Sequence, residues 1–174
     1  MAKLKIKLDK GATIPVYGSA GASGFDLASS VYAVIAPGHT MMVSTGLKIE
    51  IPEGFEIQVR PRSGLALKHS ITVLNTPGTV DSDYTGTIGV ILINHGDKAF
   101  TINPGDRIAQ GVFAKVEDPV TFIVVDELKE TKRGQSGFGS TGYQVYMIGS
   151  ESIHIPDPIY PDIRDKKDLQ SPNQ

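Results

Sequence analysis

Short extended runs between regular turn signals restrict the fold of this chain more than any other feature of its sequence. Turns that contain proline or glycine recur at 37–39, 52–54, 76–78, 85–87 and 103–106, with β-branched runs between them. Turn residues at this spacing leave room for strands and for few helices. The pattern predicts an all-β fold, and a jelly-roll-like β-barrel is the natural way to hide so many strand edges.

Individual runs predict how the strands are buried. The run KLKIKL at 3–8 alternates as a half-exposed strand does. The runs IGVILI at 88–93 and FIVV at 122–125 are continuously apolar, so we expect them to be buried on both faces. The remaining pattern allows one or two short helices, around 63–70 and 125–132.

Composition excludes several classes of protein. At 174 residues the chain has the size of one domain with a single core. It has no cysteine, which excludes a disulfide framework, a thiol nucleophile and a zinc ribbon. The four histidines are too scattered for metal-ligand spacing, and each is most simply a surface or hydrogen-bonded residue: His39, His69, His95 and His154.

Charge and hydropathy bound the partners of the chain. The formal net charge of −2 and the pI of about 6.1 exclude a broad electrostatic attraction to nucleic acid. A polyanionic ligand would therefore have to meet a local cluster of arginine and lysine. No apolar run approaches the roughly 18 residues of a membrane span, and the first ten residues alternate instead of forming a signal peptide. We expect no membrane association and a cytoplasmic location, in the host cytoplasm if the source is viral.

A glycine-rich stretch near the end, GFGSTG at 137–142, matches the G-x-G-x-x-G pattern of dinucleotide-binding proteins. That pattern is meaningful only where a strand precedes the first glycine and a helix follows the last. Here the charged segment 126–133 precedes it, and YQVYMI at 143–148, which follows, is extended in character. The flanks exclude a Rossmann site, and composition alone favours a flexible linker.

This stretch is one of five polar segments in a chain otherwise rich in strands: 19–29, 60–70, 75–87, 103–111 and 133–142. Taken singly, each has a simple structural interpretation. Asp26 could cap a turn, and Asp106 with Arg107 could form an ion pair. In the second segment, Arg62 and the start of a short helix at Ser63 suit a phosphate, although an ordinary helix cap with solvated arginines is equally consistent.

In their order and spacing, the five segments resemble the five motifs of the trimeric deoxyuridine triphosphate nucleotidohydrolases, the dUTPases. The resemblance runs from about residue 15 to residue 142, and PRSGLA, DSDY, GDRIAQ and GFGSTG are the most specific stretches. It implies the β-barrel of that family and a homotrimer whose active sites are shared between subunits. It also implies hydrolysis of dUTP to dUMP and pyrophosphate, with water attacking the α-phosphorus and Mg²⁺ on the triphosphate.

The resemblance also implies roles for single residues. Asp81 would orient and help to deprotonate the attacking water, Tyr84 would pack on the deoxyribose, and Asp26 would act through metal-bound water. The other substrate contacts in the body of the chain would come from Arg62, Ser63, Gly64, Asn75, Gly78, Thr79, Val80 and Gln110. The fifth motif would close over the substrate as a mobile arm, with contacts from Arg133, Phe138, Gly139, Ser140 and Thr141.

The same resemblance divides the chain into a β-barrel core at 1–132, a glycine-rich arm at 133–142 and an extension at 143–174. The extension is expected to be a short strand followed by disorder, and it has no assigned role. Four residues depart from the usual family pattern: Thr85, Thr87 and Gly89, which stand where many members carry Arg, Glu and Lys, and Ser136, which replaces a common glycine.

Two other functions are open to the same fold. The deoxycytidine triphosphate deaminases resemble the dUTPases but use a glutamate on the strand after the third motif, and no acidic residue occurs between Thr87 and Asn94. A binding or regulatory protein without catalysis is the second alternative. Every residue with a catalytic or phosphate role is present, which argues against it, but an additional regulatory role stays open.

Overall fold

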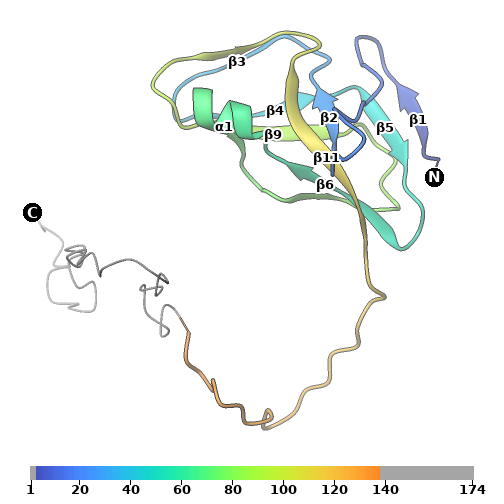
Figure 1. Ribbon diagram of the computed structural model, residues 1–174, viewed down its shortest axis with the longest axis vertical. Coiled ribbons are helices and arrows are strands. Elements are labelled where there is room, and N and C mark those ends of the chain that lie inside the picture. Colours follow the sequence, from blue (N-terminus) through green and yellow to red (C-terminus); the bar gives the residue numbers. More distant parts are fainter. Residues whose placement is uncertain (1–2, 138–174) are drawn as a thin grey trace, which may run out of the picture. The chain divides into compact units, whose positions relative to one another are not determined.

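The computed structural model describes residues 3–137 and divides the chain into two units, which meet between residues 122 and 123. The first unit contains every strand and helix of the described residues (Figure 1). The elements are β1 (Lys5–Leu8), β2 (Phe25–Ala28), β3 (Ala33–Ile35), β4 (Thr40–Ser44), β5 (Leu47–Glu50), β6 (Phe55–Arg60), α1 (Ser63–His69), β7 (Ile71–Val73), β8 (Gly78–Val80), β9 (Gly89–Asn94), β10 (Phe100–Ile102) and β11 (Arg107–Lys115). This element content confirms the predicted all-β fold.

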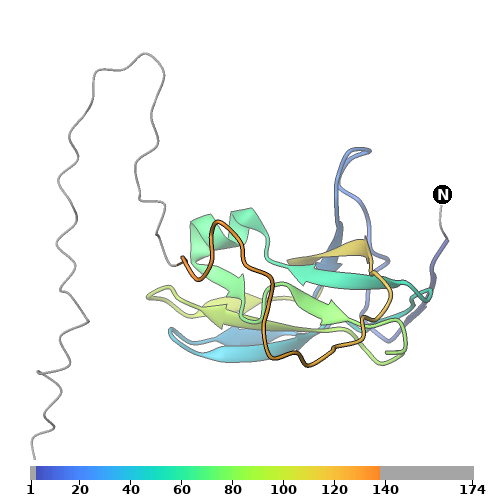
Figure 2. The same cartoon turned by 90° about the horizontal axis from the view of Figure 1, so that it is seen from below.

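The strands form four antiparallel sheets in the first unit. The larger two have the strand orders β2-β11-β6-β8 and β4-β9-β7, and they lie on opposite sides of one core (Figure 2). The pairs β1-β5 and β10-β3 complete the unit. The predicted strand at 3–8 is confirmed as β1, which pairs with β5 along its whole length.

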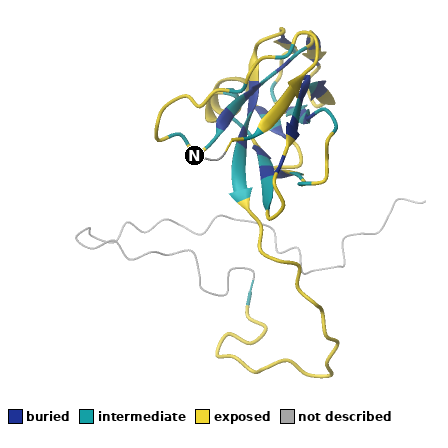
Figure 3. Ribbon diagram, turned by 90° about the vertical axis from the view of Figure 1, so that its right-hand side faces the viewer, coloured by how far each residue is buried: buried dark blue, intermediate teal, exposed yellow. Residues whose placement is uncertain are grey.

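Alternation along the strands builds the core. Successive side chains of a strand point to opposite faces, so every second residue turns inward. In β2, for example, Phe25 and Leu27 are buried while their neighbours are half-buried. Figure 3 shows that the buried residues are concentrated in the strands of the first unit. The largest fully buried apolar side chains come from seven strands and from the residue just before β9: Leu27, Ile35, Ile57, Ile71, Ile88, Leu92, Ile102 and Ile108.

The apolar run at 88–93 behaves differently from the prediction. In β9, Val90 and Leu92 are buried, whereas Gly89, Ile91 and Ile93 are only half-buried. The strand is the middle one of its sheet, and only one face of that sheet rests on the core. The prediction of burial on both faces is therefore wrong for the chain by itself.

The helix predicted around 63–70 is confirmed as α1, which ends at Ser70 in the left-handed conformation. The helix predicted around 125–132 is wrong, because that segment has no helical residue. The burial predicted for 122–125 is also wrong, since Phe122, Ile123 and Val124 are exposed. A helix of two turns needs a packed face to be stable, and these side chains have none within the described residues of their own chain. Across residues 3–137, no helix has the length and apolar character needed to cross a membrane.

Candidate active site

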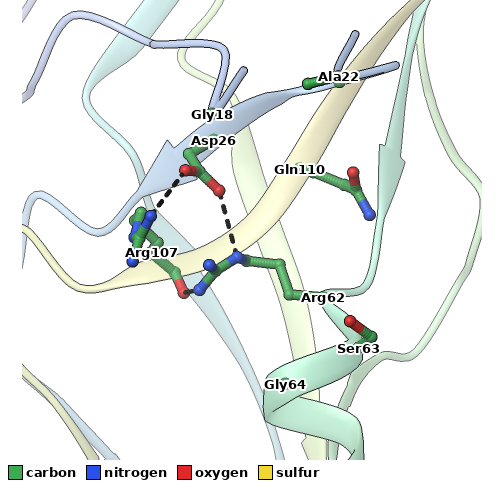
Figure 4. A pocket seen from close by; sticks show the side chains of 9 residues that line it. Gly18, Ala22, Asp26, Arg62, Ser63, Gly64, Arg107 and Gln110 are labelled. Carbon is green, nitrogen blue, oxygen red and sulfur yellow. Dashed lines mark hydrogen bonds and ion pairs between the residues drawn. The ribbon is translucent and has the colours of Figure 1, made fainter.

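A polar pocket of about 280 Å³ lies where β2, β11, the end of β6 and the start of α1 meet (Figure 4). Nine residues line it: Gly18, Ala22, Gly24, Asp26, Arg62, Ser63, Gly64, Arg107 and Gln110. Apart from Gly18, which directly precedes the first polar segment, they come from the first, second and fourth polar segments of the sequence. Folding thus brings together the residues of three segments that are far apart along the chain.

Sheet register places the central side chains of this polar pocket. Gln110 of β11 stands opposite Asp26 of β2 on one side and opposite Arg60 of β6 on the other. The side-chain amide nitrogen of Gln110 also donates to the carbonyl of Pro61, over 2.9 Å. This bond holds the turn between β6 and α1 against β11, so Arg62 and the start of α1 face the same pocket as Asp26.

Asp26 lies between two arginines. Its Oδ1 is 3.2 Å from Nε of Arg62, and its Oδ2 accepts a hydrogen bond of 3.2 Å from Nη1 of Arg107. Nη1 of Arg62 donates to the backbone carbonyl of Arg107 over 2.9 Å, which fixes the Arg62 guanidinium group relative to β11. Two positive charges against one negative charge leave this group with a net charge of +1. The pocket therefore attracts an anion.

The start of α1 adds donors to the same pocket. Ser63 and Gly64 are the first residues of the helix and are both exposed to the pocket. The first turn of α1 has no acidic side chain, and the N-cap residue Arg62 makes no capping hydrogen bond with its side chain. Backbone N–H groups in this position carry partial positive charge. Together with the arginines, they suit the oxygens of a phosphate.

The wall of the pocket opposite α1 depends on a missing side chain. A Cβ at Gly24 would lie 3.0 Å from Oε1 of Gln110 and 3.0 Å from the carbonyl oxygen of Gly111. The segment before β2 can therefore approach β11 this closely only with glycine at this position. An added side chain would push the segment away from Gln110 and alter the pocket.

The third polar segment forms a separate group around β8, which we call the β8 group: Asn75, Gly78, Thr79, Val80, Asp81 and Tyr84. A Cβ at Gly78 would lie 3.1 Å from the amide nitrogen of Asn75, so that side chain folds tightly over the start of β8. Asp81 and Tyr84 follow the strand in a turn, in which the Tyr84 amide donates to the Asp81 carbonyl over 3.2 Å. Both side chains are exposed.

Asp81 and Tyr84 of the β8 group lie toward the start of β6, and the polar pocket lies beyond its end. In the antiparallel pairing, Gly78 stands opposite Val59 and Val80 opposite Ile57. Asp81 therefore continues toward the start of β6, whereas Arg62 comes after its end. At roughly 3.3 Å per residue, the five steps along the chain from Ile57 to Arg62 span about 16 Å. One chain does not bring Asp81 and Tyr84 into its own polar pocket.

The remaining predicted residues belong to the second unit. The Arg133 side chain lies in a turn, where its Nε donates to the carbonyl of Ser136 over 2.9 Å. Phe138, Gly139, Ser140 and Thr141 lie outside the described residues. Between residues 3 and 137, no group of three or more Asp, Glu or His side chains forms a cluster that could hold a metal ion by itself.

Comparison with known proteins identifies the family. A family model described as dUTPase matches residues 10–142, which is more than half of the chain. The chain belongs to the dUTPase family. Among curated dUTPases, the deoxyuridine 5'-triphosphate nucleotidohydrolase of Nautilia profundicola is 56% identical over 141 residues, which cover 80% of this chain and 99% of that protein. The enzyme of the same name from Wolinella succinogenes is 57% identical over 145 residues, covering 82% and 97% of the two chains.

Solved structures of dUTPases share the architecture. The dUTPase of Staphylococcus bacteriophage 80alpha, solved with dUPNHPP, superposes with a TM-score of 0.75 at 26% identity. The superposition covers 82% of this chain and all of the phage protein. This likeness agrees with the jelly-roll-like β-barrel expected for a dUTPase.

Arg107 is a residue of the dUTPase pocket that the sequence analysis missed. Its expected ion pair with Asp106 is absent from the described ion pairs. Asp106 instead accepts a hydrogen bond of 2.7 Å from the amide of Asn103, and Arg107 pairs with Asp26. The register of β11 shifts between Arg107 and Ala109, a bulge that puts Arg107 opposite Ala28 and Gln110 opposite Asp26. Simple alternation would put Arg107 and Gln110 on opposite faces, and only the bulge brings them to one face.

Proposed function

We propose that this chain hydrolyses dUTP to dUMP and pyrophosphate, as a dUTP diphosphatase, by attack of water on the α-phosphorus. One observation carries the proposal: side chains from three dUTPase motifs, Asp26, Arg62 and Gln110, converge on a polar pocket with excess positive charge. The chain belongs to the dUTPase family, and its curated relatives carry the name of this activity.

The polar pocket would hold the α- and β-phosphates. Arg62 has donors left over after its contacts with Asp26 and the Arg107 carbonyl, because a guanidinium group carries five N–H bonds. Ser63 and Gly64 add a hydroxyl and backbone donors, and the Gln110 amide lies across the pocket from them. Several fixed donors around one anion orient the phosphate chain for attack from one side.

The outer edge of β8 would recognise the uracil. β8 is the last strand of its sheet, so the backbone groups of Thr79 and Val80 that do not pair with β6 are available to a ligand, whereas Gly78 is buried and would act by letting the Asn75 side chain lie close to the strand. With the Asn75 amide, they would match the donors and acceptors of uracil. Cytosine presents a different pattern of donors and acceptors, and the methyl group of thymine would clash at such a close-fitting edge.

Asp81 and Tyr84 would act at the sugar and at the reacting phosphorus. The Asp81 carboxylate would accept a hydrogen bond from the 3'-hydroxyl and take a proton from the attacking water. The Tyr84 ring would pack on the deoxyribose and leave no room for a 2'-hydroxyl. Their exposure leaves both side chains accessible to a ligand.

We further propose that the active sites are shared within a homotrimer. The separation of about 16 Å along β6 leaves Asp81 too far from Arg62 for one chain to complete a site. A closed ring of three identical subunits would supply the polar pocket of one subunit and the β8 group of the next. The exposed apolar side chains of Phe122, Ile123 and Val124 support contact with another subunit.

The fifth motif would complete the site as a separate arm. We propose that residues 1–132 form the core, that 133–142 close over the bound nucleotide, and that 143–174 extend beyond the arm. Arg133, Ser140 and Thr141 would hold the γ-phosphate, with Gly139 allowing close approach of the backbone and Phe138 stacking on the base.

The polar pocket fits a magnesium ion that is held mainly by phosphates and water. Mg²⁺ commonly keeps several waters and takes one or two carboxylates together with substrate phosphates. Asp26 supplies one carboxylate at the pocket, and it would contact the ion through water while Arg62 and Arg107 hold its position. When bound, the ion would supply charge neutralisation on the triphosphate.

Release of pyrophosphate from dUTP, measured beside dCTP, dTTP and UTP with Mg²⁺ present, tests the proposed function. We expect turnover with dUTP and little with the other three nucleotides. Ammonia release from dCTP would instead identify a deaminase. Binding of dUTP without pyrophosphate release would indicate a protein that uses the fold for binding alone.

A further inference from the structure

The ring of Tyr84 is held against its own turn. Its hydroxyl donates to the carbonyl of Thr87 over 2.9 Å. The ring lies directly on Gly86, where an added Cβ would come within 2.5 Å of the hydroxyl oxygen and 2.6 Å of Cζ. The side chain is still 47% exposed, so one part of the ring rests on the turn and the rest is open to a ligand.

The end of this turn is tied to a distant part of the chain by three side chains, which we call the Asp9 clamp: Asp9, Lys48 and Thr87. The hydroxyl of Thr87 donates to Oδ2 of Asp9 over 3.1 Å. The other carboxylate oxygen, Oδ1, is paired with the Lys48 ammonium at 2.9 Å. The carboxylate is therefore held from both sides, and it in turn holds the side chain of Thr87.

Backbone hydrogen bonds attach both ends of the Asp9 clamp to the start of β5. The Asp9 amide donates to the carbonyl of Gly46 over 2.8 Å, just before β5. The amide of Ile88, next to Thr87, donates to the Leu47 carbonyl over 2.8 Å. Lys48 itself belongs to β5. The Thr87 carbonyl, which holds the Tyr84 hydroxyl, is thus fixed in position relative to β5, which lies outside the turn.

The identity of Thr87 matters for this arrangement. Many members of the family that the sequence resembles carry glutamate at this position. A carboxylate there would face the carboxylate of Asp9. Threonine instead provides a hydroxyl that can donate to Asp9. Threonine in place of the usual glutamate therefore suits Asp9, the partner that this chain provides.

We propose that the Asp9 clamp positions the Tyr84 ring and thereby sets how strongly the enzyme prefers deoxyribonucleotides over ribonucleotides. The inference rests on the proposed function, in which that ring packs on the sugar. A 2'-hydroxyl adds a single oxygen, so its exclusion requires the ring to stay within a fraction of an ångström of one position. Without the clamp, the exposed turn and the carbonyl that anchors the ring can move and make room for the extra oxygen. Asp9, Lys48 and Thr87 are positioning residues, because none of them touches the nucleotide in this arrangement.

The first experiment compares kcat/KM for UTP and dUTP in the full chain and in variants at position 87. Thr87→Val removes the hydroxyl at nearly constant shape, and we expect the UTP to dUTP ratio to rise roughly three- to tenfold, the effect of losing one hydrogen bond. Thr87→Ser keeps the hydroxyl and is expected to keep the ratio. Thr85→Val is the matched control, since Thr85 is exposed in the same turn and makes no side-chain hydrogen bond within residues 3–137.

The second experiment removes the other end of the clamp. Asp9→Ala should raise the same ratio as Thr87→Val does. Glu50→Ala is its control, because Glu50 pairs with Lys5 at 2.9 Å across the same two strands, β1 and β5, without touching the Tyr84 turn. The ratio is formed within one preparation, so a change in the fraction of folded enzyme cancels.

The possible results separate the inference from the proposed function. If the unaltered chain hydrolyses dUTP but Thr87→Val and Asp9→Ala leave the ratio unchanged, the inference is wrong and the proposed function stands. An equal loss of activity on both substrates also overturns the inference, because it indicates a merely structural role. If the unaltered chain does not hydrolyse dUTP, both fall together.

Discussion

At the scale of single residues, Asp26 organises the polar pocket although it is negatively charged, like the proposed phosphate ligand. Its two oxygens hold Arg62 and Arg107 at 3.2 Å each, so the carboxylate fixes where the positive charges lie. Arg62 and Gln110 were predictable as pocket residues from their motifs. Arg107 was not, because a strand read by simple alternation turns it away from Gln110, and a bulge leaves no distinct mark in a single sequence.

The catalytic assignment of Asp81 can be tested by changing its carboxylate to an amide. Asp81→Asn keeps the size of the side chain but removes the base, so we expect turnover to fall by about 10² to 10⁴ with little change in dUTP binding. Single-turnover kinetics and equilibrium binding of a non-hydrolysable dUTP analogue measure the two quantities. A variant that turns over dUTP at close to the normal rate would exclude Asp81 as the partner of the water.

The Asp9 clamp makes a prediction about acidity. The hydrogen bond from Lys48 is the largest cause that holds the pKa of Asp9 below its usual value, and Thr87 and Lys7 act in the same direction. Lys48→Met should therefore raise the pKa of Asp9 toward the usual value, as measured by NMR titration of its carboxyl carbon. Lys5→Met is the control, since Lys5 pairs with Glu50, and it should leave the titration of Asp9 unchanged.

The sign of the pH effect follows from the direction of this shift. A carboxyl whose pKa is lowered in the folded chain stabilises the folded chain. The stabilisation is fully present at every pH above the ordinary pKa that the carboxyl has in the unfolded chain. The stabilisation is lost as the pH falls through the lowered pKa, below the usual range for aspartate. The Asp9 clamp should accordingly stay intact in mildly acidic solution, and a clamp that opens between pH 6 and pH 5 would contradict the structure.

At the scale of elements, the sequence predicted most of what turns and alternation control. The strand at 3–8 and the helix at 63–70 follow from local patterns, and both are present as β1 and α1. The structure of segment 122–132 could not be predicted from local patterns, because its apolar and charged residues resemble both a buried strand and an amphipathic helix. Which of these forms depends on a packing partner, and sequence periodicity does not reveal whether the same chain supplies one.

β6 is the element whose packing supports both halves of the proposed site. Its side chain Ile57 is fully buried, and the strand pairs with β11 on one side and β8 on the other. We expect Ile57→Ala to lower the free energy of unfolding by about 2–5 kcal/mol. Urea denaturation at one protein concentration measures this change. Leu67→Ala is the control, since Leu67 in α1 is 87% exposed and its truncation should change stability by less than about 0.5 kcal/mol.

At the scale of the whole molecule, the two halves of the proposed site lie apart within one chain. The polar pocket gathers residues from β2, α1, β11 and the turns beside them, whereas Asp81 and Tyr84 lie toward the start of β6. The motifs predict which residues take part in the site. They do not predict that one chain keeps them apart, because that separation depends on the register between β6 and β8.

Subunit mixing tests whether the halves come from different chains. Asp81→Asn and Arg62→Ala should each be nearly inactive alone, because each disables one half of every site. Co-expressed in equal amounts, they should regain activity, since about one quarter of the sites in randomly assembled trimers would have both halves intact. Mixing Asp81→Asn with a chain that carries both substitutions is the control and should remain inactive. No gain in the first mixture would show that each chain completes its own site.

The position of β8 at the edge of its sheet has a consequence for how the base preference can evolve. On the proposed function, uracil is recognised largely by peptide groups of Thr79 and Val80. A nucleotide substitution in a gene exchanges a side chain and leaves the peptide group unchanged. Base choice in this protein should thus be robust to most point mutations along β8, and a shift toward another pyrimidine would require a change in backbone path, such as an insertion, a deletion or a new proline.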